Sequence, residues 1–158
     1  PVKYIERTRA YYSAQGFSAY QWTVNESAPW TPLNKPLERC MVALLSTGGV
    51  FHKEQPPFKN ERDDLTYREI SKNVDVRDLR IVHYAYDHTD AKKDINCIFP
   101  IERFQELEAE GYIGELAPVA FTLMGGIFRR TYVRTEMAPR ILQRLKDMKA
   151  DVLFLVPA

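Results

Sequence analysis

The densest group of side chains capable of acid–base chemistry lies in residues 82–100, VHYAYDHTDAKKDINCIFP. It holds two of the three histidines, His83 and His88, together with several aspartates. Histidine titrates near neutral pH, so a His–Asp pair placed in a pocket could transfer protons. The aspartates could instead only build turns by accepting backbone hydrogen bonds. We take His52, His88 and Asp87 as candidate catalytic residues, and His83, inside an apolar run, as a structural histidine with satisfied ring nitrogens.

The same histidines and carboxylates are donor types that metal ions bind. Their spacing, however, contains no compact ligand motif such as His-Glu-x-x-His. We therefore predict no metal ligands in this chain. A stand-alone hydrolase or lyase that uses the His/Asp cluster, with or without a metal ion, stays open as an alternative function.

Three apolar runs are followed by segments rich in glycine or histidine, STGGVFH, HYAYDHTD and MGG. Because ligands bind at the carboxyl ends of parallel strands, we expect these segments to line one pocket, with His52 facing it. The glycine pairs could let the backbone approach an anionic group, or could only form sharp turns with positive φ. The predicted substrate-binding residues are Thr47, Gly48, Gly49, Tyr86, Asp90, Asn96, Met124, Gly125 and Gly126.

The two cysteines, Cys40 and Cys97, stand in no paired motif, which favours a reducing compartment and a cytoplasmic protein. Cys97 lies just before a predicted helix, whose N-terminus could lower the pKa of its thiol. We take it as a candidate nucleophile, although a small apolar filler is the commoner role of such a cysteine. Cys40 begins a predicted buried strand and is assigned to the core.

Apolar runs and amphipathic segments alternate along the chain, which predicts an α/β fold. We expect a mainly parallel sheet flanked by helices, doubly wound in flavodoxin- or Rossmann-like layers, with an extended N-terminal arm. Residues 1–38 would combine a helix with this proline-rich arm, whose aromatic residues should lie across the sheet or a partner subunit. Residues 39–158 would form an α/β domain that is incomplete at its C-terminus. The expected parallel strands are residues 40–46, 79–85, 119–124 and 151–156, the expected helices are 2–14, 100–111 and 135–150, and a half-exposed strand is expected at 64–70.

The composition limits the classes of partner. The 158 residues carry 22 lysines and arginines against 21 aspartates and glutamates, so no overall field attracts nucleic acid or an anionic membrane. No apolar run approaches the roughly 18 residues that suggest a membrane-spanning helix. We therefore expect neither nucleic acid nor a membrane as a partner.

Several longer blocks of the sequence carry a family resemblance. In order, they are VALLSTGGVFHKEQPPF, DLTYREI, DHTDAKKDINCIFPIERFQELEAEGYIGELAP and FTLMGG, preceded by PWTPL. Over residues 29–158 they resemble the selenoprotein B family of glycine, sarcosine and betaine reductase and of D-proline reductase. The block KDINCIFPI is especially similar to the D-proline reductase subunit.

The resemblance implies an oxidoreductase subunit that cleaves a carbon–nitrogen bond of a small amino-acid-like substrate, with a dithiol or thioredoxin-type electron donor. In the family, a selenocysteine or cysteine after the last strand attacks the carbon that bears nitrogen, and dithiols resolve the adduct. A pyruvoyl group on a partner subunit can hold the substrate. We accordingly expect a homo-oligomer or a hetero-oligomeric reductase complex.

The sequence stops at LFLVPA, where the resemblance places the selenocysteine or cysteine segment. We expect that residue just after Ala158, no cofactor within the chain itself, and no dithiol-dependent turnover by residues 1–158 alone. A final parallel strand without a covering helix also favours a truncated domain. If the protein lacks the nucleophile, a non-catalytic binding or scaffold homologue is the remaining alternative.

Overall fold

The computed structural model describes residues 3–19, 24, 26–29 and 31–158. The chain divides into two units, residues 1–32 and residues 33–158. In the first unit, the predicted N-terminal helix is α1 (Tyr4–Ala14), which ends shortly before Gly16 at φ 82°. The ring of Tyr12 meets that of Phe17 edge to face, with 6.0 Å between centroids. Three aromatic residues expected in the arm, Tyr20, Trp22 and Trp30, lie outside the described residues.

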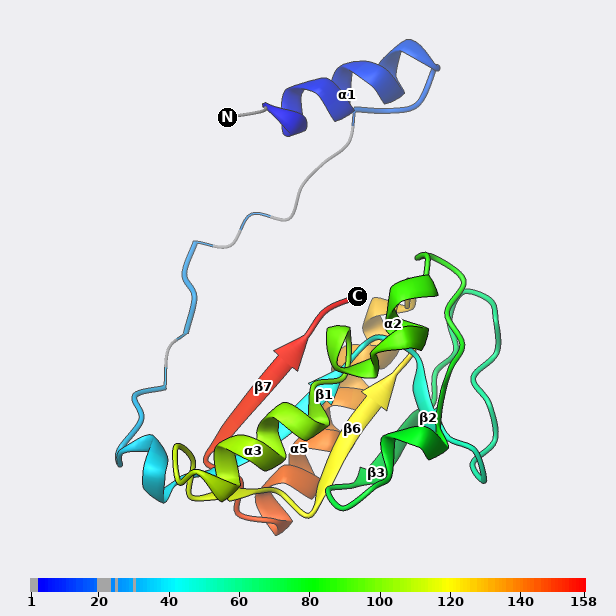
Figure 1. The fold of residues 1–158 in the computed structure, drawn as a ribbon. Coiled ribbons are helices and arrows are strands. Elements are labelled where there is room, and N and C mark those ends of the chain that lie inside the picture. Colours follow the sequence, from blue (N-terminus) through cyan, green and yellow to red (C-terminus); the bar gives the residue numbers. More distant parts are fainter. Residues whose placement is uncertain (1–2, 20–23, 25, 30) are drawn as a thin grey trace. The chain divides into compact units, whose positions relative to one another are not determined.

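A mixed sheet forms the centre of the second unit (Figure 1). Its strand β1 (Met41–Ser46) pairs in parallel with β5 (Glu115–Leu116), β6 (Val119–Leu123) and β7 (Val152–Val156). Strand β3 (Tyr67–Ser71) pairs antiparallel with β6 and corresponds to the half-exposed strand predicted from the sequence. The α/β class and three of the four predicted parallel strands are therefore confirmed.

The register of the pairs places β1 at the centre of the sheet. Val42 is opposite both Leu116 of β5 and Val152 of β7, so these two strands lie on opposite sides of β1. Leu45 pairs with β6 as well as with Leu155 of β7, which puts β6 on the same side as β5. Within the described part of the chain, β7 is therefore an edge strand, and most of its side chains are exposed.

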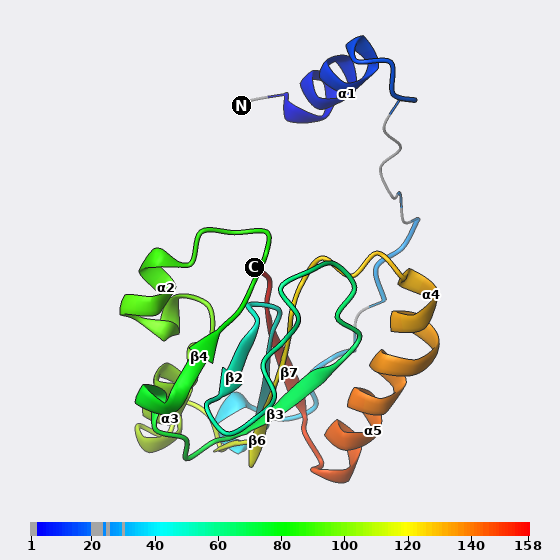
Figure 2. The ribbon, with the colours of Figure 1, turned by 90° about the vertical axis from the view of Figure 1, so that its right-hand side faces the viewer.

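Helices cover both faces of this sheet (Figure 2). Side chains of β1 alternate between the faces, as the pleat of a strand requires. The even-numbered residues pack in a cluster with α3 (Ile101–Ala109), and the odd-numbered ones pack in a cluster with α5 (Ala138–Asp147). The continuous apolar run at 40–47 thus belongs to a strand buried on both faces, as predicted.

The helix predicted at residues 135–150 begins with an irregular turn. α5 follows a short helix, α4 (Arg130–Tyr132), and a five-residue π-turn, η4 (Val133–Met137). Pro139 lies in the first turn of α5 and has no amide hydrogen to donate to the preceding turn. The wider turn just before it accommodates this missing hydrogen bond.

The strand predicted at residues 79–85 is wrong in both length and direction. Only β4 (Leu79–Ile81) is a strand, and it pairs antiparallel with β2 (Val50–His52) in a separate two-stranded sheet. The exposed Arg80 interrupts the apolar run, and its guanidinium donates to the carbonyl oxygens of Arg77 and Leu79. A strand buried on both faces would have to take this charge out of water at a large cost in free energy. The central sheet is mixed because β3 pairs antiparallel with β6, and the doubly wound, flavodoxin- or Rossmann-like layering stays a prediction.

Short helical turns complete the second unit. They are η1 (Leu37–Arg39), η2 (Val76–Asp78), α2 (Thr89–Lys93) and η3 (Ile95–Cys97). Cys40 is fully buried in the core, as expected. Among the described residues, no helix has the length and apolar character needed to cross a membrane.

Candidate functional site

The carboxyl ends of three parallel strands meet at Thr47, the residue that follows β1. Its N–H donates to the carbonyl oxygen of Val156 in β7 (3.0 Å), and its own carbonyl oxygen accepts from the N–H of Gly125 after β6 (2.8 Å). The Thr47 hydroxyl accepts from the N–H of Ala158 (2.9 Å). Thr47 therefore ties together the segments after β1, β6 and β7, at the end of the sheet where open α/β folds bind ligands.

The segment between β4 and α2 contacts the glycine turns after β1 and β6. The Tyr86 hydroxyl donates to the carbonyl oxygen of Gly48 (2.9 Å), and the Tyr84 hydroxyl donates to that of Gly126 (3.2 Å). The predicted residue Met124 also forms a backbone bridge with Gly48. Most of the predicted substrate-binding residues are therefore brought together. We call the following residues the strand-end cluster: Thr47, Gly48, Gly49, His83, Tyr84, Tyr86, Gly125 and Gly126.

Two glycines of the cluster are required by the close approach of this segment. Gly49 has φ 69°, and a Cβ atom there would lie 1.9 Å from the carbonyl oxygen of Val82. Gly126 has φ 75°, and a Cβ atom there would lie 1.9 Å from the Tyr84 hydroxyl. Both positions combine a left-handed backbone with a contact that leaves no room for a side chain. The sharp-turn interpretation therefore accounts for these two glycines.

His83 is the buried histidine of the cluster, with 4% of its surface exposed. Its Nδ1 accepts the N–H of Ala85 (3.1 Å), so the proton of the neutral ring resides on Nε2. Among the described residues this Nε2 has no hydrogen-bond partner, and the expectation of a satisfied structural histidine is wrong. Burial, followed by the nearby His88, lowers the pKa of His83, which keeps the ring neutral at pH 7.

Tyr86 lies between the two histidines of this segment. Its ring centroid is 4.5 Å from that of His83 and 5.8 Å from that of His88. Burial raises the pKa of Tyr86 to about 12, so its hydroxyl remains a hydrogen-bond donor at neutral pH. The cluster therefore offers neutral donors, backbone carbonyl oxygens and aromatic surface, which suit the binding and orientation of a small polar molecule.

The other candidates in this stretch make local contacts around α2 and η3. Asp87 accepts from both the hydroxyl and the N–H of Thr89 (2.6 and 2.9 Å), and these hydrogen bonds lower the pKa of its carboxyl group. Asp90 forms an ion pair with a lysine of the same helix (2.8 Å), and Asn96 bonds to two neighbouring carboxylates. Cys97 is exposed in η3. The turn-forming alternative accounts for the contacts of Asp87.

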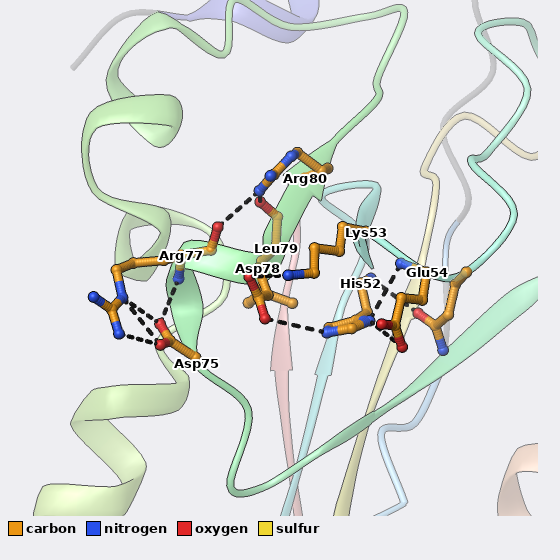
Figure 3. Close-up of polar contacts among 9 residues, drawn as sticks. His52, Lys53, Glu54, Asp75, Arg77, Asp78, Leu79 and Arg80 are labelled. Atoms are coloured by element: carbon orange, nitrogen blue, oxygen red, sulfur yellow. Dashed lines mark hydrogen bonds and ion pairs between the residues drawn. The ribbon is translucent and has the colours of Figure 1, made fainter.

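His52 lies at the far end of β2, among a separate set of charged groups (Figure 3). Its Nε2 is 3.8 Å from the Asp78 carboxylate, which also binds the Lys53 ammonium at 2.8 Å. From Gly49, at roughly 3.3 Å per residue, β2 carries the chain about 10 Å away. Its polar contacts are therefore with this set and not with the strand-end cluster. The catalytic roles of His52, His88 and Asp87 stay predictions.

The sequence placed the segment that contains His83 and Tyr84 at the pocket, but neither residue was predicted as a binding residue. The available signal was the density of aromatic rings at positions 83, 84 and 86, directly after an apolar run. A high number of aromatic residues does not tell which of their side chains point into the fold, because that depends on the antiparallel pairing of β4 with β2. The contact of both residues with the turn after β6 is likewise a long-range feature.

Two further features lie outside the cluster. Among the described residues, no group of three or more histidines, cysteines, aspartates and glutamates is placed to hold a metal ion. A hollow of about 520 Å³ lies beside β4 and α2 and is lined by several basic side chains. Two of these, Arg77 and Lys93, are paired with neighbouring aspartates, so the hollow carries less free positive charge than its composition indicates.

Comparison with known proteins identifies relatives of this chain. Residues 17–158 match the family model for glycine/sarcosine/betaine reductase selenoprotein B. The chain is 37% identical over 126 residues to the D-proline reductase subunit gamma of Acetoanaerobium sticklandii, which covers 80% of this chain and 52% of that protein. It is 29% identical over 102 residues to the sarcosine reductase complex component B subunit beta of Peptoclostridium acidaminophilum, covering 62% and 23% of the two chains. No solved structure matches.

A third relative is the glycine reductase complex component B subunit gamma of Symbiobacterium thermophilum, 27% identical over 135 residues. That alignment covers 82% of this chain and 31% of the relative. The chain thus spans about half, or less, of the length of the relatives it matches. The match to the family model extends over the complete strand-end cluster. On these findings, the chain belongs to the glycine/sarcosine/betaine reductase selenoprotein B family.

Proposed function

We propose that this chain is part of a reductase subunit that cleaves a carbon–nitrogen bond of a small amino-acid-like substrate. The observation that carries the proposal is its 37% identity to a D-proline reductase subunit over 80% of the chain. D-Proline is therefore the first candidate substrate, with glycine, sarcosine and betaine as the others. The names of the relatives also support a hetero-oligomeric complex, and the unpaired cysteines support a cytoplasmic location.

The proposed reaction is a two-electron reduction. A selenolate or thiolate attacks the carbon that bears nitrogen and forms a carbon–selenium or carbon–sulfur bond, while the displaced nitrogen takes up a proton. A thiol then attacks the selenium or sulfur, and the carbon takes up a proton and leaves as the reduced product. A dithiol, such as that of a thioredoxin-type donor, supplies the two electrons and ends as a disulfide.

We assign the nucleophile to a selenocysteine or cysteine in the segment that follows β7. Because β7 runs parallel to β1, such a segment would leave the sheet beside Thr47 and the glycine turns. Cys97, exposed in η3, is the alternative nucleophile within the chain. A pyruvoyl group would come from a partner subunit, and we assign no residue of this chain to it.

We further propose the strand-end cluster as the substrate-binding part of this subunit. Three features support it: the convergence of the parallel strand ends on Thr47, the buried donor on His83 and the aromatic surface of Tyr86. A small substrate held here would lie next to the segment that follows β7. The nucleophile and the bound carbon would then be close together, which is the main requirement for an efficient displacement.

The test is anaerobic turnover by the full-length protein together with its partner subunit. Dithiothreitol would serve as the reductant, and D-proline, glycine, sarcosine and betaine would be supplied separately. We expect one dithiol oxidised for each carbon–nitrogen bond broken, with ring-opened 5-aminopentanoate as the product from D-proline. Serine in place of the selenocysteine or cysteine after β7 should abolish turnover. Absence of product from all four substrates would refute the proposal, and loss of turnover in Cys97→Ala would instead place the nucleophile in η3.

A further inference from the structure

Nothing in the described part of the chain accepts the Nε2–H of His83, which is an unusual feature of the strand-end cluster. Leaving a buried donor without an acceptor costs free energy, and such groups in folded proteins nearly always have a partner in protein, water or ligand. The Nδ1 of this ring is occupied by the N–H of Ala85 (3.1 Å), so the ring cannot turn to satisfy Nε2 without losing that hydrogen bond. His83 therefore presents one fixed donor to whatever occupies the cluster.

The atoms around this donor indicate what such an occupant must offer. A methyl group built on Gly125 would lie 3.2 Å from the Nε2 of His83 and 3.4 Å from the carbonyl oxygens of both Thr47 and Ala158. One donor and two acceptors therefore lie around the α-carbon of Gly125, and an occupant would have to contact all three from beside this glycine. Ala158 is exposed, so the group is bordered by solvent on the side of the chain after β7.

We propose, on the basis of the proposed function, that His83 is a substrate-positioning residue for a small zwitterion that carries a carboxylate beside an N–H group. Nε2–H of His83 donates to a carboxylate oxygen, because a fixed donor requires a lone pair opposite it. The N–H groups of the same molecule donate to the carbonyl oxygens of Thr47 and Ala158. Amino and imino acids such as D-proline meet both requirements, whereas the quaternary nitrogen of betaine has no hydrogen to donate.

Two nearly isosteric substitutions separate this role from a purely structural one. In His83→Asn, the side-chain oxygen can still accept the N–H of Ala85, but no donor reaches the Nε2 position. In His83→Gln, the longer amide can place a donor near Nε2 but loses the acceptor for Ala85. If His83 only supports the turn, Asn should behave like the parent protein and Gln should lower the thermal midpoint. If His83 positions the substrate, Asn should weaken D-proline binding by roughly 10- to 100-fold, and Gln should restore part of it.

The direct measurement is a long-range ¹H–¹⁵N spectrum of the imidazole groups in the full-length protein at pH 7. His83, assigned by its absence in His83→Asn, should carry its proton on Nε2. D-Proline should move the Nε2–H signal downfield, whereas pyrrolidine, which lacks the carboxylate, should leave it in place. Betaine should bind at least about tenfold more weakly than D-proline. A proton on Nδ1, an unmoved signal with D-proline, or equal shifts with D-proline and pyrrolidine would each overturn the proposal.

A blocking variant provides a second test. Gly125 has no positive φ, so alanine fits its backbone, and the new methyl group would occupy the point between the three polar atoms. Gly125→Ala should abolish the D-proline shift of His83 while the protein remains folded. This result is independent of turnover. If D-proline shifts the His83 signal but is not turned over, the proposed reductase function is refuted and an amino-acid binding site remains. If D-proline is turned over without any shift of the His83 signal, only the proposed role of His83 is refuted.

Discussion

Alanine in place of Gly49 should destabilise the α/β unit far more than the same change at another left-handed glycine. A non-glycine residue in this conformation costs roughly 1–2 kcal/mol, partly offset by about 0.4–1 kcal/mol from the stiffer unfolded chain. At Gly49 the new Cβ atom would also lie 1.9 Å from the carbonyl oxygen of Val82. Atoms in ordinary van der Waals contact are about 3.5 Å apart, so the segment after β4 must move away by more than 1 Å. That movement breaks the hydrogen bond from the N–H of Val82 to Gly49 (3.0 Å), at about 1–3 kcal/mol. The expected total is about 3 kcal/mol.

Gly111 provides the matched control for this substitution. It has φ 75°, and a Cβ atom there would meet nothing within 4 Å, so Gly111→Ala carries the backbone cost alone, about 1 kcal/mol. Urea unfolding of both variants, followed by circular dichroism, gives the two changes in the free energy of unfolding. Equal losses in the two variants would show that the contact between the first glycine turn and the segment after β4 is not tight, and would remove the support for the strand-end cluster.

Three further outcomes are expected. Phe121→Ala should lower the free energy of unfolding by about 3–5 kcal/mol because Phe121 is fully buried, whereas Phe154→Ala, at a residue 48% exposed, should lower it by about 1 kcal/mol or less. Equal losses for the two variants in urea unfolding would contradict the assignment of Phe121 to the buried layer. Glu69 accepts two hydrogen bonds from Arg144, which hold the pKa of Glu69 below 4.5. The coupling free energy between Glu69 and Arg144, measured in a double-mutant cycle, should be present above pH 4.5. It should disappear as the pH falls through the lowered pKa of Glu69, and a coupling that grows on acidification would contradict this prediction. Tyr86→Phe should cost about 1–2 kcal/mol in thermal unfolding, because the buried carbonyl oxygen that it binds loses its donor, and an unchanged midpoint would argue against that hydrogen bond.

Local sequence patterns were sufficient for much of the fold. The run at 40–47 carries apolar side chains on both faces over most of its length, which correctly predicted a strand between two layers. The spacing of Ile101 and Phe104 on one helix face predicted α3 and its buried side. These features depend on neighbours in the chain, so a single sequence reveals them.

Features that depend on distant pairings were missed. Residues 79–85 have the apolar composition of a buried strand, but only β4 is a strand, and it pairs with β2 in a separate two-stranded sheet. His83, beyond the end of β4, lies beside Gly125. The same two-stranded sheet places His52 at its far end, among charged partners. The binding of ligands at the carboxyl ends of parallel strands was the reason to expect the glycine turns and the HYAYDH segment to meet, and they do meet, although β4 is not one of those parallel strands. Which ring nitrogen of His83 lacks a partner among the described residues could not be predicted, because that is decided by the hydrogen bond from Ala85.

The most direct test of the strand-end cluster as the substrate site is kcat/KM for D-proline in the complete reductase carrying Gly125→Ala. The matched control is Leu142→Ala, which removes an exposed side chain from α5. We predict a loss of at least about tenfold for Gly125→Ala, expressed mainly as a higher KM, and a change of less than about twofold for Leu142→Ala. Parent-like kinetics in Gly125→Ala, together with a large loss in His52→Ala, would contradict the account and place the site at the far end of β2.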